Sequence, residues 1–502
     1  MALARLYNRS LQRKSIFPHP FHLCRSLSTI MAPSATSSVT NGASKANTTS
    51  LIHRTPWTPP IAISAEGLYV TLEDNRRVLD AVGGAAVACI GASNLHVKQA
   101  IKDQLDRLPY VYSMQLSNEP AEKLAKVLTA SGSGAFDLVG FVSGGSEAME
   151  GVIKLARQYY EEIGQLQRKN FIARKLSYHG NTVATLALAY HPSRRAPYEA
   201  ILDHDNFHHV SPAFAKRFQL PDETEEQYVL RLQKELEDKF IELGPDTVIG
   251  FVAETVVGAS TGCCPAPKGY FKAMKEVCDK YGALFILDEV MSGMGRMGTL
   301  HAWESFGDGV APDIQAVAKG LGGGYASIGA VLMNKRVADG LRGKSGFWKH
   351  GHTYQSHPLA CAASLAVQEV IESDNLLENC RKQGAYLEKL LNERLRGPNA
   401  LAAPYTFDVR GGGLFWGIEF DFTSPDARKV DLKGKAFAME VQARALEKSL
   451  IIMGMTGGSN LAGDRGDHLM LCPAYNITKE EVEKIVDIFV ASVEEVLQAN
   501  FV

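Results

Sequence analysis

The sequence predicts an α/β protein with a large, mainly parallel sheet and a smaller α+β domain. From about residue 85, short apolar runs alternate with longer helical patterns, the order typical of a parallel sheet with helices on both faces. These runs become polar only at their carboxyl ends, as in strands that are buried on both sides. After about residue 356 the alternation gives way to long helices and short strands, which indicates the smaller domain.

The individual elements follow from side-chain periodicity. Residues 147–161 carry apolar side chains at spacings of three and four, which define one face of a helix, and a second helix is expected after Pro267. The strands expected in the large domain are 139–142, 171–173, 247–253, 284–287, 314–318 and 331–333. The smaller domain is expected to contain helices at 357–373, 375–395, 434–448 and 478–498, and strands near 406–410, 414–420, 450–453 and 469–471.

The amino-terminal region differs from the rest of the chain. The first 65 residues contain seven Lys or Arg and no acidic residue, and the first thirty are rich in Ser and Leu. This composition is typical of a mitochondrial import segment, although a disordered tail without an address is an alternative. Met31 could also start a shorter, cytosolic form. Residues 32–50 are small and polar and are expected to form a flexible linker.

We therefore expect four parts in the chain. A targeting segment and linker occupy 1–50, and 51–90 form the amino-terminal segment of the small domain. The large domain spans 91–355 and the carboxyl-terminal part of the small domain spans 356–502.

Composition excludes several functional classes. No apolar run approaches the roughly 20 residues that a membrane helix requires, so we expect no membrane partner. The net charge of the whole chain is −2, and the basic amino terminus leaves the body distinctly acidic, which argues against a nucleic-acid partner. The eight cysteines form no CxxC pair, and neither HExxH nor GxxxxGK[ST] occurs. We expect no metal site and no phosphate-binding loop of the nucleotide-hydrolase type.

Lys319 and Asp288 each follow an apolar run. A lysine at a strand end, followed by glycines as in AVAKGLGGG, is a candidate Schiff-base nucleophile, because burial lowers its pKa and preserves its nucleophilicity. A solvated lysine is the alternative. The carboxylate of Asp288, after LFIL, needs a compensating cation such as a protonated pyridine nitrogen. A metal ligand or a helix cap would also account for Asp288.

Two loops complete the candidate site. The turn 143–146 precedes the helix expected at 147–161 and contains Gly145 and Ser146, so free N–H groups and the helix dipole could bind a phosphate there. Many such turns are only tight turns. Tyr178, in SYHG, could stack on a cofactor ring, although a core or surface tyrosine is the simpler interpretation.

The motifs SGGSEAMEGVIKLAR, SYHGNT, LFILDEVMSGMGRMG, PDIQAVAKGLGGGY and HGHTYQSHPLACAA occur in this order. Together they resemble the class III aminotransferases, which include ω-amino-acid and amine:pyruvate transaminases. The resemblance runs from about Glu66 to the carboxyl terminus. It implies the pyridoxal-phosphate-dependent fold type I, pyridoxal 5′-phosphate as cofactor, and a homodimer with active sites at the subunit interface.

The resemblance also implies roles for individual residues. Lys319 forms the Schiff base and moves the proton, Asp288 binds the pyridine nitrogen, and Gly145 and Ser146 hold the phosphate. Val290 and Tyr178 pack on opposite faces of the cofactor ring. The hydroxyl of Thr353 reaches the phosphate in the partner subunit.

Substrate recognition is less well defined by the motifs. Arg410, in DVRGGGL, matches an arginine that binds the carboxylate of 2-oxo acids, and Glu254 matches a glutamate that pairs with it when no carboxylate is bound. A structural ion pair is the alternative for Arg410. Arg465, in a glycine-rich stretch, could be a mobile carboxylate ligand or a solvated loop residue. The family pattern is broken at Gly144, which replaces a serine, and at Thr255, which replaces a proline.

These features predict an aminotransferase that moves an amino group from a primary amine or ω-amino acid to a 2-oxo acid by a ping-pong mechanism. A decarboxylase, racemase or aminomutase on the same scaffold is the alternative from within the cofactor class. A non-catalytic scaffold is the alternative from outside it. The motifs do not identify the donor or the pathway.

Overall fold

The computed structural model describes residues 49–425 and 427–502. The described residues 49–59 are separate from the compact unit 60–502, which contains every described helix and strand. The expected import segment and all of the linker except its last two residues lie outside the described residues. None of the helices in the described part of the chain combines the length and apolarity that a bilayer crossing requires.

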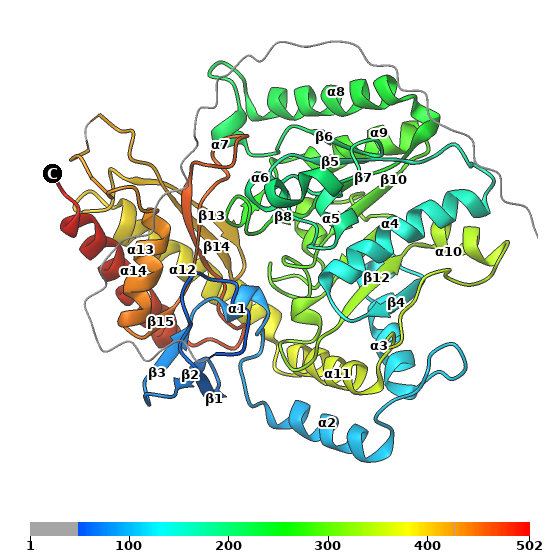
Figure 1. Ribbon diagram of the computed structural model, residues 1–502, viewed down its shortest axis with the longest axis horizontal. Helices are drawn as coiled ribbons and strands as arrows, with labels where there is room; N and C mark the ends of the chain where they lie inside the picture. The colour runs from blue at the N-terminus through cyan, green and yellow to red at the C-terminus, as the bar shows by residue number, and fades with distance from the viewer. Residues whose placement is uncertain (1–48, 426) are drawn as a thin grey trace, which may run out of the picture. The chain divides into compact units, whose positions relative to one another are not determined.

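A seven-stranded sheet forms the centre of the described large domain (Figure 1). All neighbouring strands run parallel except β12, which is antiparallel to the strands on both sides of it. In spatial order the strands are β4 (Leu138–Val142), β12 (Gly329–Met333), β11 (Ile314–Val317), β10 (Leu284–Asp288), β7 (Val248–Glu254), β5 (Asn170–Arg174) and β6 (Phe207–Val210). The expected strands of this sheet are confirmed.

Both faces of the sheet are buried, as the apolar strands predict. Phe285 and Leu287 of β10 pack with helices α3 (Glu119–Ala130), α8 (Glu225–Leu243) and α9 (Tyr270–Lys280). The alternate side chains Leu284 and Ile286 pack on the opposite face with α4 (Gly145–Glu162) and α10 (Lys335–Arg342). Because successive side chains of a strand point to opposite faces, a strand covered on both sides must be apolar at every position.

The smaller domain is built on two four-stranded sheets. One has the order β13 (Thr406–Gly412), β14 (Phe415–Phe420), β17 (Asp467–Leu471) and β16 (Met453–Met455). The other has the order β1 (Ala62–Glu66), β2 (Tyr69–Leu72), β3 (Arg77–Asp80) and β15 (Leu450–Ile451). Helices α12 (Leu376–Arg396), α13 (Phe437–Glu447) and α14 (Lys479–Ala499) pack with these sheets in one core.

One expected strand is wrong in detail. Residues 450–453 were expected to form a single strand, but the chain changes sheets at Ile452. Leu450 pairs in parallel with Leu79 of β3, whereas Met453 pairs antiparallel with Met470 of β17. A continuous apolar run fits both arrangements, so the sequence pattern alone does not reveal the change.

The remaining elements are shorter or connect the two parts. The helices are α1 (Gly83–Ala86), α2 (Leu95–Arg107), α5 (Val183–Leu188), α6 (Pro192–Arg195), α7 (Ala215–Phe218) and α11 (Pro358–Ser373). The 3-10 turns are η1 (Gly132–Gly134), η2 (Ala196–Ile201), η3 (Pro245–Thr247), η4 (Ala302–Phe306) and η5 (Lys319–Leu321). Two short strands, β8 (Val256–Val257) and β9 (Cys264–Pro265), form a separate pair.

Helix α12 has no room for a side chain at Gly384. A methyl group there would overlap the carbonyl oxygen of Gly413, in the turn between β13 and β14. We expect Gly384→Ala to lower the free energy of unfolding by about 1–3 kcal/mol, because the helix must move away from the turn. Urea-induced unfolding followed by circular dichroism measures this change.

The matched control is Gly343→Ala. Gly343 has a φ of −69°, and an added Cβ would lie no closer than 3.3 Å to any backbone atom. Alanine adopts this backbone conformation without strain, so a change within about 0.5 kcal/mol is expected. Equal effects of the two substitutions would contradict the packing argument.

Candidate active site

The carboxyl ends of three neighbouring strands bring the predicted polar residues together. β7 ends at Glu254 and β10 ends at Asp288, and these two residues are direct partners across the strand pair. Lys319 lies two residues beyond the end of β11, the next strand. Ligands of open α/β sheets bind at this edge because loops and helix amino termini converge there.

Asp288 is almost completely buried and accepts two hydrogen bonds. Its Oδ2 lies 2.8 Å from Nδ1 of His179, and its Oδ1 accepts the backbone N–H of Val290 at 2.9 Å. The His179 side chain is fully buried, and its Nε2 has no partner among the described residues. His179 was not predicted as a site residue, although it lies inside the SYHG motif, because one histidine beside a tyrosine has no distinctive spacing.

Lys319 is held in an unusual backbone conformation. Its φ is +40°, a region that residues with a Cβ rarely adopt. The turn that follows is fixed by Gln368 of α11, whose side-chain amide donates to the carbonyl oxygens of Gly320 and Leu321 at 3.2 and 3.0 Å. Burial lowers the pKa of the Lys319 amine, and the nearby carboxylates of Asp288 and Glu254 oppose that shift.

The first turn of α4 offers unused backbone donors. Gly144 caps this helix without a side-chain acceptor, and the first N–H groups of any helix lack intrahelical partners. The Ser146 hydroxyl accepts the N–H of Asn181 at 3.1 Å, which leaves its own proton available. A Cβ on Gly145 would lie 2.6 Å from Cγ1 of Val290, so only glycine allows this close approach.

Tyr178 lies beside Glu254 in the loop after β5. Its backbone N–H donates to Oε1 of Glu254 at 2.9 Å, and Oε2 of Glu254 accepts the N–H of Gly258 at 3.0 Å. Burial raises the pKa of the Glu254 carboxyl. The guanidinium of Arg194 lies over the Tyr178 ring, 5.0 Å from its centroid. Arg194 was not predicted, because an arginine in a polar loop gives no sequence signal.

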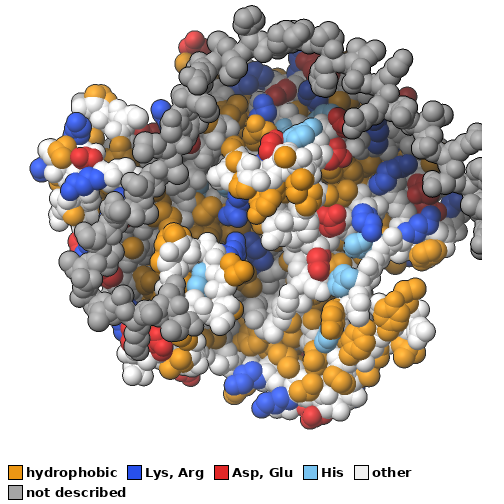
Figure 2. Space-filling view, in the orientation of Figure 1, with side chains coloured by type: hydrophobic (Ala, Val, Ile, Leu, Met, Phe, Trp, Pro, Cys, Tyr) orange, Lys and Arg blue, Asp and Glu red, His pale blue; other side chains and the backbone are white. Residues whose placement is uncertain are grey.

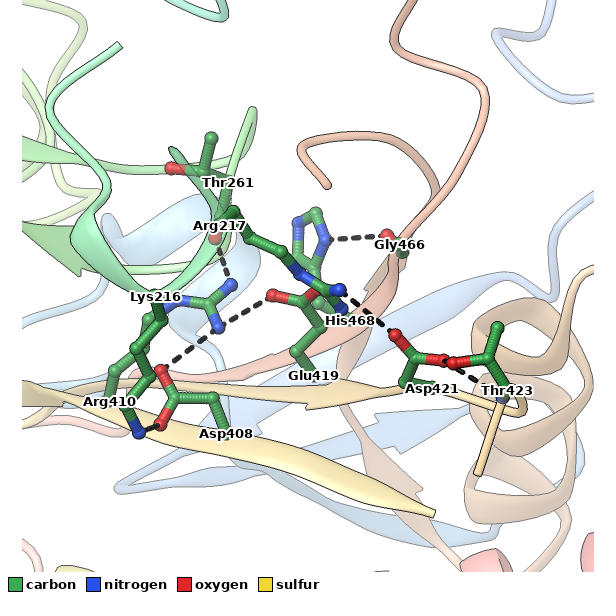
Figure 3. Close-up of polar contacts among 10 residues, drawn as sticks. All are labelled: Lys216, Arg217, Thr261, Asp408, Arg410, Glu419, Asp421, Thr423, Gly466 and His468. Atoms are coloured by element: carbon green, nitrogen blue, oxygen red, sulfur yellow. Dashed lines mark hydrogen bonds and ion pairs between the residues drawn. The ribbon is translucent and has the colours of Figure 1, made fainter. Parts of the chain in front are cut away.

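Arg410 does not pair with Glu254 in this structure. Nη1 of Arg410 lies 2.8 Å from Oε2 of Glu419 and 3.5 Å from Oδ2 of Asp408, and Nη2 donates to the carbonyl oxygen of Thr261 (Figure 3). Glu254 is occupied by two backbone N–H groups instead. A buried guanidinium with three acceptors has the contacts of the structural ion pair that was the alternative.

Arg410 belongs to a larger charged network. Arg217 of α7 contacts Glu419 and also Asp421, at 2.9 Å, while Lys216 pairs with Asp408 (Figure 3). Asp408 and Glu419 are direct partners across β13 and β14. Two carboxylates opposite one another repel, and the cations of Arg410, Arg217 and Lys216 offset this repulsion.

Thr353 and Arg465 lie outside this group of contacts. Thr353 is exposed, and its carbonyl oxygen accepts the hydroxyl of Tyr110 at 2.9 Å. The preceding residue, His352, places Nε2 3.5 Å from Oε2 of Glu147 in the first turn of α4. Arg465 is exposed and forms no ion pair within the described part of the chain, which agrees with the solvated-loop alternative.

The comparisons with known proteins agree with this geometry. Residues 54–493 match the family model of aminotransferase class III. An uncharacterized aminotransferase of Schizosaccharomyces pombe is 44% identical over 431 residues, 86% of this chain and 91% of its own. Gamma-aminobutyrate transaminase 1, mitochondrial, of Oryza sativa subsp. indica is 31% identical and aligns over 95% of this chain and 90% of its own.

Solved structures extend the comparison to the fold. The omega transaminase from Pseudomonas jessenii in complex with PMP superposes with a TM-score of 0.79 at 29% identity, covering 88% of this chain and 94% of that chain. A transaminase from a study of directed evolution by ancestral reconstruction has a TM-score of 0.80 at 31% identity, covering 88% of this chain and 93% of that chain.

The chain therefore belongs to the class III aminotransferases, with the fold of the pyridoxal-phosphate-dependent transferases of fold type I. It is an aminotransferase that uses pyridoxal phosphate to move an amino group from an amine or ω-amino acid to a 2-oxo acid. The observed residues fit this cofactor: a buried amine, a buried carboxylate and an uncapped helix start lie at one sheet edge.

The ion-pair network makes a testable prediction about stability. Glu419→Gln leaves the buried guanidinium of Arg410 without its nearest carboxylate. We expect the free energy of unfolding to fall by about 3–5 kcal/mol, the usual effect of breaking a buried ion pair. Urea-induced unfolding measures the loss.

Glu369→Gln serves as the matched control. Glu369 also forms a close pair, 2.7 Å from His96, but both side chains are more than half exposed. A change of at most about 1 kcal/mol is expected there because water screens the pair. A small effect at Glu419 would show that Arg410 is not held by this carboxylate.

Proposed function

We propose that Lys319 holds pyridoxal phosphate through its aldehyde carbon and acts as the proton carrier of the transamination. The observation that carries this proposal is the position of a desolvated amine beside two buried carboxylates at adjacent strand ends. A lowered pKa leaves more of the amine uncharged near neutral pH, and only the uncharged amine attacks an aldehyde. Once the substrate amine has replaced the Lys319 amine at the aldehyde carbon, Nζ of Lys319 is free to accept the proton from the substrate Cα.

The cofactor, when bound, supplies a conjugated ring that stores the electron pair of the deprotonated Cα. Asp288 favours this storage by keeping the pyridine nitrogen protonated. Its second contact, Nδ1 of His179 at 2.8 Å, fixes the carboxylate in one orientation. His179 is therefore proposed as a positioning residue, because its polar contact within the described chain is with Asp288.

The first turn of α4 is proposed to bind the phosphate. The N–H groups of Gly145 and Ser146 and the helix dipole attract an anion, and the Ser146 hydroxyl adds one more donor. Gly144 provides no side-chain hydroxyl, so the backbone contributes most of the binding. Val290 contacts Gly145 closely, which suits a side chain that packs against a ring bound beside the phosphate.

Tyr178 is proposed to cover the other face of the ring. Glu254 fixes this loop by accepting the backbone N–H of Tyr178 and that of Gly258. We therefore propose that Glu254 positions this loop. Its carboxylate lies near the reacting atoms but does not contact them. The side chains of Tyr178 and Glu254 also shield the reaction from water, which strengthens the electrostatic interactions within the active site.

We propose that the enzyme is a homodimer. Large apolar side chains are exposed on and after α2, and Figure 2 shows hydrophobic side chains gathered over that part of the surface. The exposed residues include Leu95, Leu105, Tyr110, Tyr112, Met114 and Leu116. Exposed apolar patches of this kind mark interaction surfaces, and a dimer would bring Thr353 to the cofactor phosphate of the partner subunit.

The predicted domain division and location remain part of the proposal. The pairing of β3 with β15 supports assigning 51–90 to the small domain together with 356–502, with 91–355 as the large domain. The basic segment 1–30 supports mitochondrial import, as does the word mitochondrial in the name of the Oryza sativa relative. A product that starts at Met31 would remain in the cytosol.

Removing the Lys319 amine tests the central assignment. We expect Lys319→Ala to reduce kcat by about 10³-fold or more and to prevent borohydride from fixing the cofactor covalently to the protein. Absorption spectroscopy and mass spectrometry after reduction measure both effects. Lys239→Ala, which removes a lysine of α8 that pairs with Glu242, is the control and should behave like the parent. Parental turnover in Lys319→Ala would overturn the proposal.

A mixed dimer tests the position of Thr353. When a Lys319→Ala subunit pairs with a Thr353→Ala subunit, one site receives both defects if Thr353 acts across the interface, and the other site receives neither. When the two impaired variants are mixed in equal amounts and exchange subunits at random, half of the dimers are mixed and each has one intact site, so about a quarter of the parental activity should return. If Thr353 instead serves its own subunit, next to the His352–Glu147 contact, no restoration occurs. Light scattering confirms the dimer in each sample.

A further inference from the structure

We infer that His468 is a positioning residue that holds two loops, residues 258–262 and the glycine-rich loop 456–466 between β16 and β17, and that it holds both at once only when each ring nitrogen carries a proton. This inference rests on the proposed function, because His468 acts on the reaction through Glu254 and Tyr178. It concerns a residue that none of the sequence motifs identified.

Both ring nitrogens of His468 face backbone carbonyl oxygens. Nε2 lies 2.9 Å from the carbonyl oxygen of Ala259, and Nδ1 lies 3.2 Å from that of Gly466 (Figure 3). A carbonyl oxygen only accepts hydrogen bonds, and a neutral imidazole has one N–H and one lone pair. Only the protonated ring, with an N–H on each nitrogen, can therefore donate to both carbonyl oxygens.

The contact with Ala259 leads to the candidate active site. The N–H of Gly258, one residue earlier, donates to Oε2 of Glu254 at 3.0 Å. The other carboxylate oxygen of Glu254, Oε1, accepts the N–H of Tyr178 at 2.9 Å. A shift of the Ala259 carbonyl group would therefore move Gly258 and, through Glu254, the loop that carries Tyr178.

The contact with Gly466 holds the glycine-rich loop beside residues 258–262. A Cβ on Gly458 would lie 2.6 Å from the carbonyl oxygen of Ser260, so the two loops pack backbone against backbone. On another side, a Cβ on Gly463 would come within 3.1 Å of Pro192, the first residue of α6. His468 thus forms hydrogen bonds to two segments that also pack against each other.

The His468 ring has little room to move. The residue is buried, and a Cβ on Gly262 would lie 2.6 Å from its Cδ2. Gly262 has a φ of +67°, a conformation that glycine adopts readily, and the missing side chain lets the ring lie against the loop. A change in the charge of the ring is therefore transmitted to the two carbonyl groups instead of being relieved by rotation of the ring.

Neighbouring groups shift the pKa of His468 in both directions. Burial has the largest effect and lowers the pKa, and the guanidinium of Arg410 on β13 lowers it further. The two carbonyl oxygens and the carboxylate of Glu419 on β14 raise it, but the net shift is downward. His191, which precedes α6, is another titratable neighbour; chiefly because of burial its pKa is lowered to about 4, so it is neutral near physiological pH.

The sign of the pH effect follows from these contacts. At neutral pH the uncharged His468 ring donates one hydrogen bond, and the shorter contact, with Ala259, keeps it. Nδ1 then presents a lone pair to the carbonyl oxygen of Gly466, which repels it. As the pH falls below the ordinary histidine pKa of about 6.5, the ring gains its second proton and the glycine-rich loop becomes fixed.

Two substitutions separate the two contacts. The amide nitrogen of glutamine lies near the position of Nε2 and that of asparagine near the position of Nδ1, and neither amide titrates. His468→Gln therefore keeps a donor for Ala259 and has none for Gly466, whereas His468→Asn does the reverse. Thermal unfolding and the absorbance of the bound cofactor check that each variant is folded.

His209→Gln is the matched control. His209 is also partly buried, and its Nε2 lies 2.9 Å from one carbonyl oxygen, that of Leu188. Its Nδ1 forms no hydrogen bond to a carbonyl oxygen within the described part of the chain. Glutamine therefore replaces the one contact of His209, and this variant should behave like the parent.

Hydrogen–deuterium exchange of the holoenzyme, followed by mass spectrometry, is the first readout. After correction for the chemical exchange rate, the amides of 456–466 in the parent should exchange about 3- to 10-fold more slowly at about pH 5.5 than at about pH 8, the usual effect of one buried hydrogen bond. His468→Gln should match the parent at the higher pH and lack the slowing at the lower pH.

The single-turnover rate of the amine half-reaction at saturating donor is the second readout. His468→Asn loses the contact with Ala259, so we expect it to lower this rate about 3- to 10-fold at about pH 8. His468→Gln keeps that contact and should stay within about 2-fold of the parent. A merely structural role would destabilise both variants without separating their rates.

The outcomes separate this inference from the proposed function. If the parent and His468→Gln show the same exchange at both pH values, the role of the second proton is overturned. If the two variants have equal half-reaction rates, the connection from His468 to Glu254 is overturned. Either result leaves the Lys319 chemistry standing, whereas full turnover in Lys319→Ala overturns the proposed function itself.

Discussion

Desolvated charge at the carboxyl ends of β7, β10 and β11 is the constraint on which the rest of the structure depends. An isolated carboxylate or ammonium in this position would be strongly disfavoured, so Glu254, Asp288 and Lys319 are tolerated because they lie together. Each also has further support: backbone N–H groups for Glu254, His179 for Asp288, and the turn fixed by Gln368 for Lys319. The sheet therefore fixes the relative positions of these three reactive groups.

Two arginines of this enzyme, Arg410 and Arg194, have very different surroundings. The guanidinium of Arg410 is surrounded by acceptors and ties β13 and β14 to the turn at Thr261. Arg194 lies over the ring of Tyr178 and forms no ion pair within the described part of the chain. Long-range packing determines the surroundings of each arginine. The local sequence does not show them, because each is a single arginine. The ion pairs and the backbone contact of Arg410 stabilise the fold by linking these strands to the turn.

Much of this arrangement was predictable from local patterns. An apolar run that ends in one polar residue gave the positions of Asp288 and Lys319, because a strand buried on both faces must be apolar until it leaves the sheet. Partners brought together by tertiary packing were not predictable. Arg410 was paired with Glu254, yet Glu419 lies closer because it is on the adjacent strand β14. The change of sheet at Ile452 was missed for the same reason.

The pairing of β3 with β15 has a consequence for how the chain is made. Leu79 and its partner Leu450 are separated by most of the polypeptide. During synthesis, β3 at the edge of the three strands β1–β3 therefore has no partner on that side until the chain is almost complete. Closing so long a loop is slow, and an unprotected strand edge invites aggregation. These strands therefore need protection from aggregation during synthesis, and their pairing with β15 is among the last steps of folding.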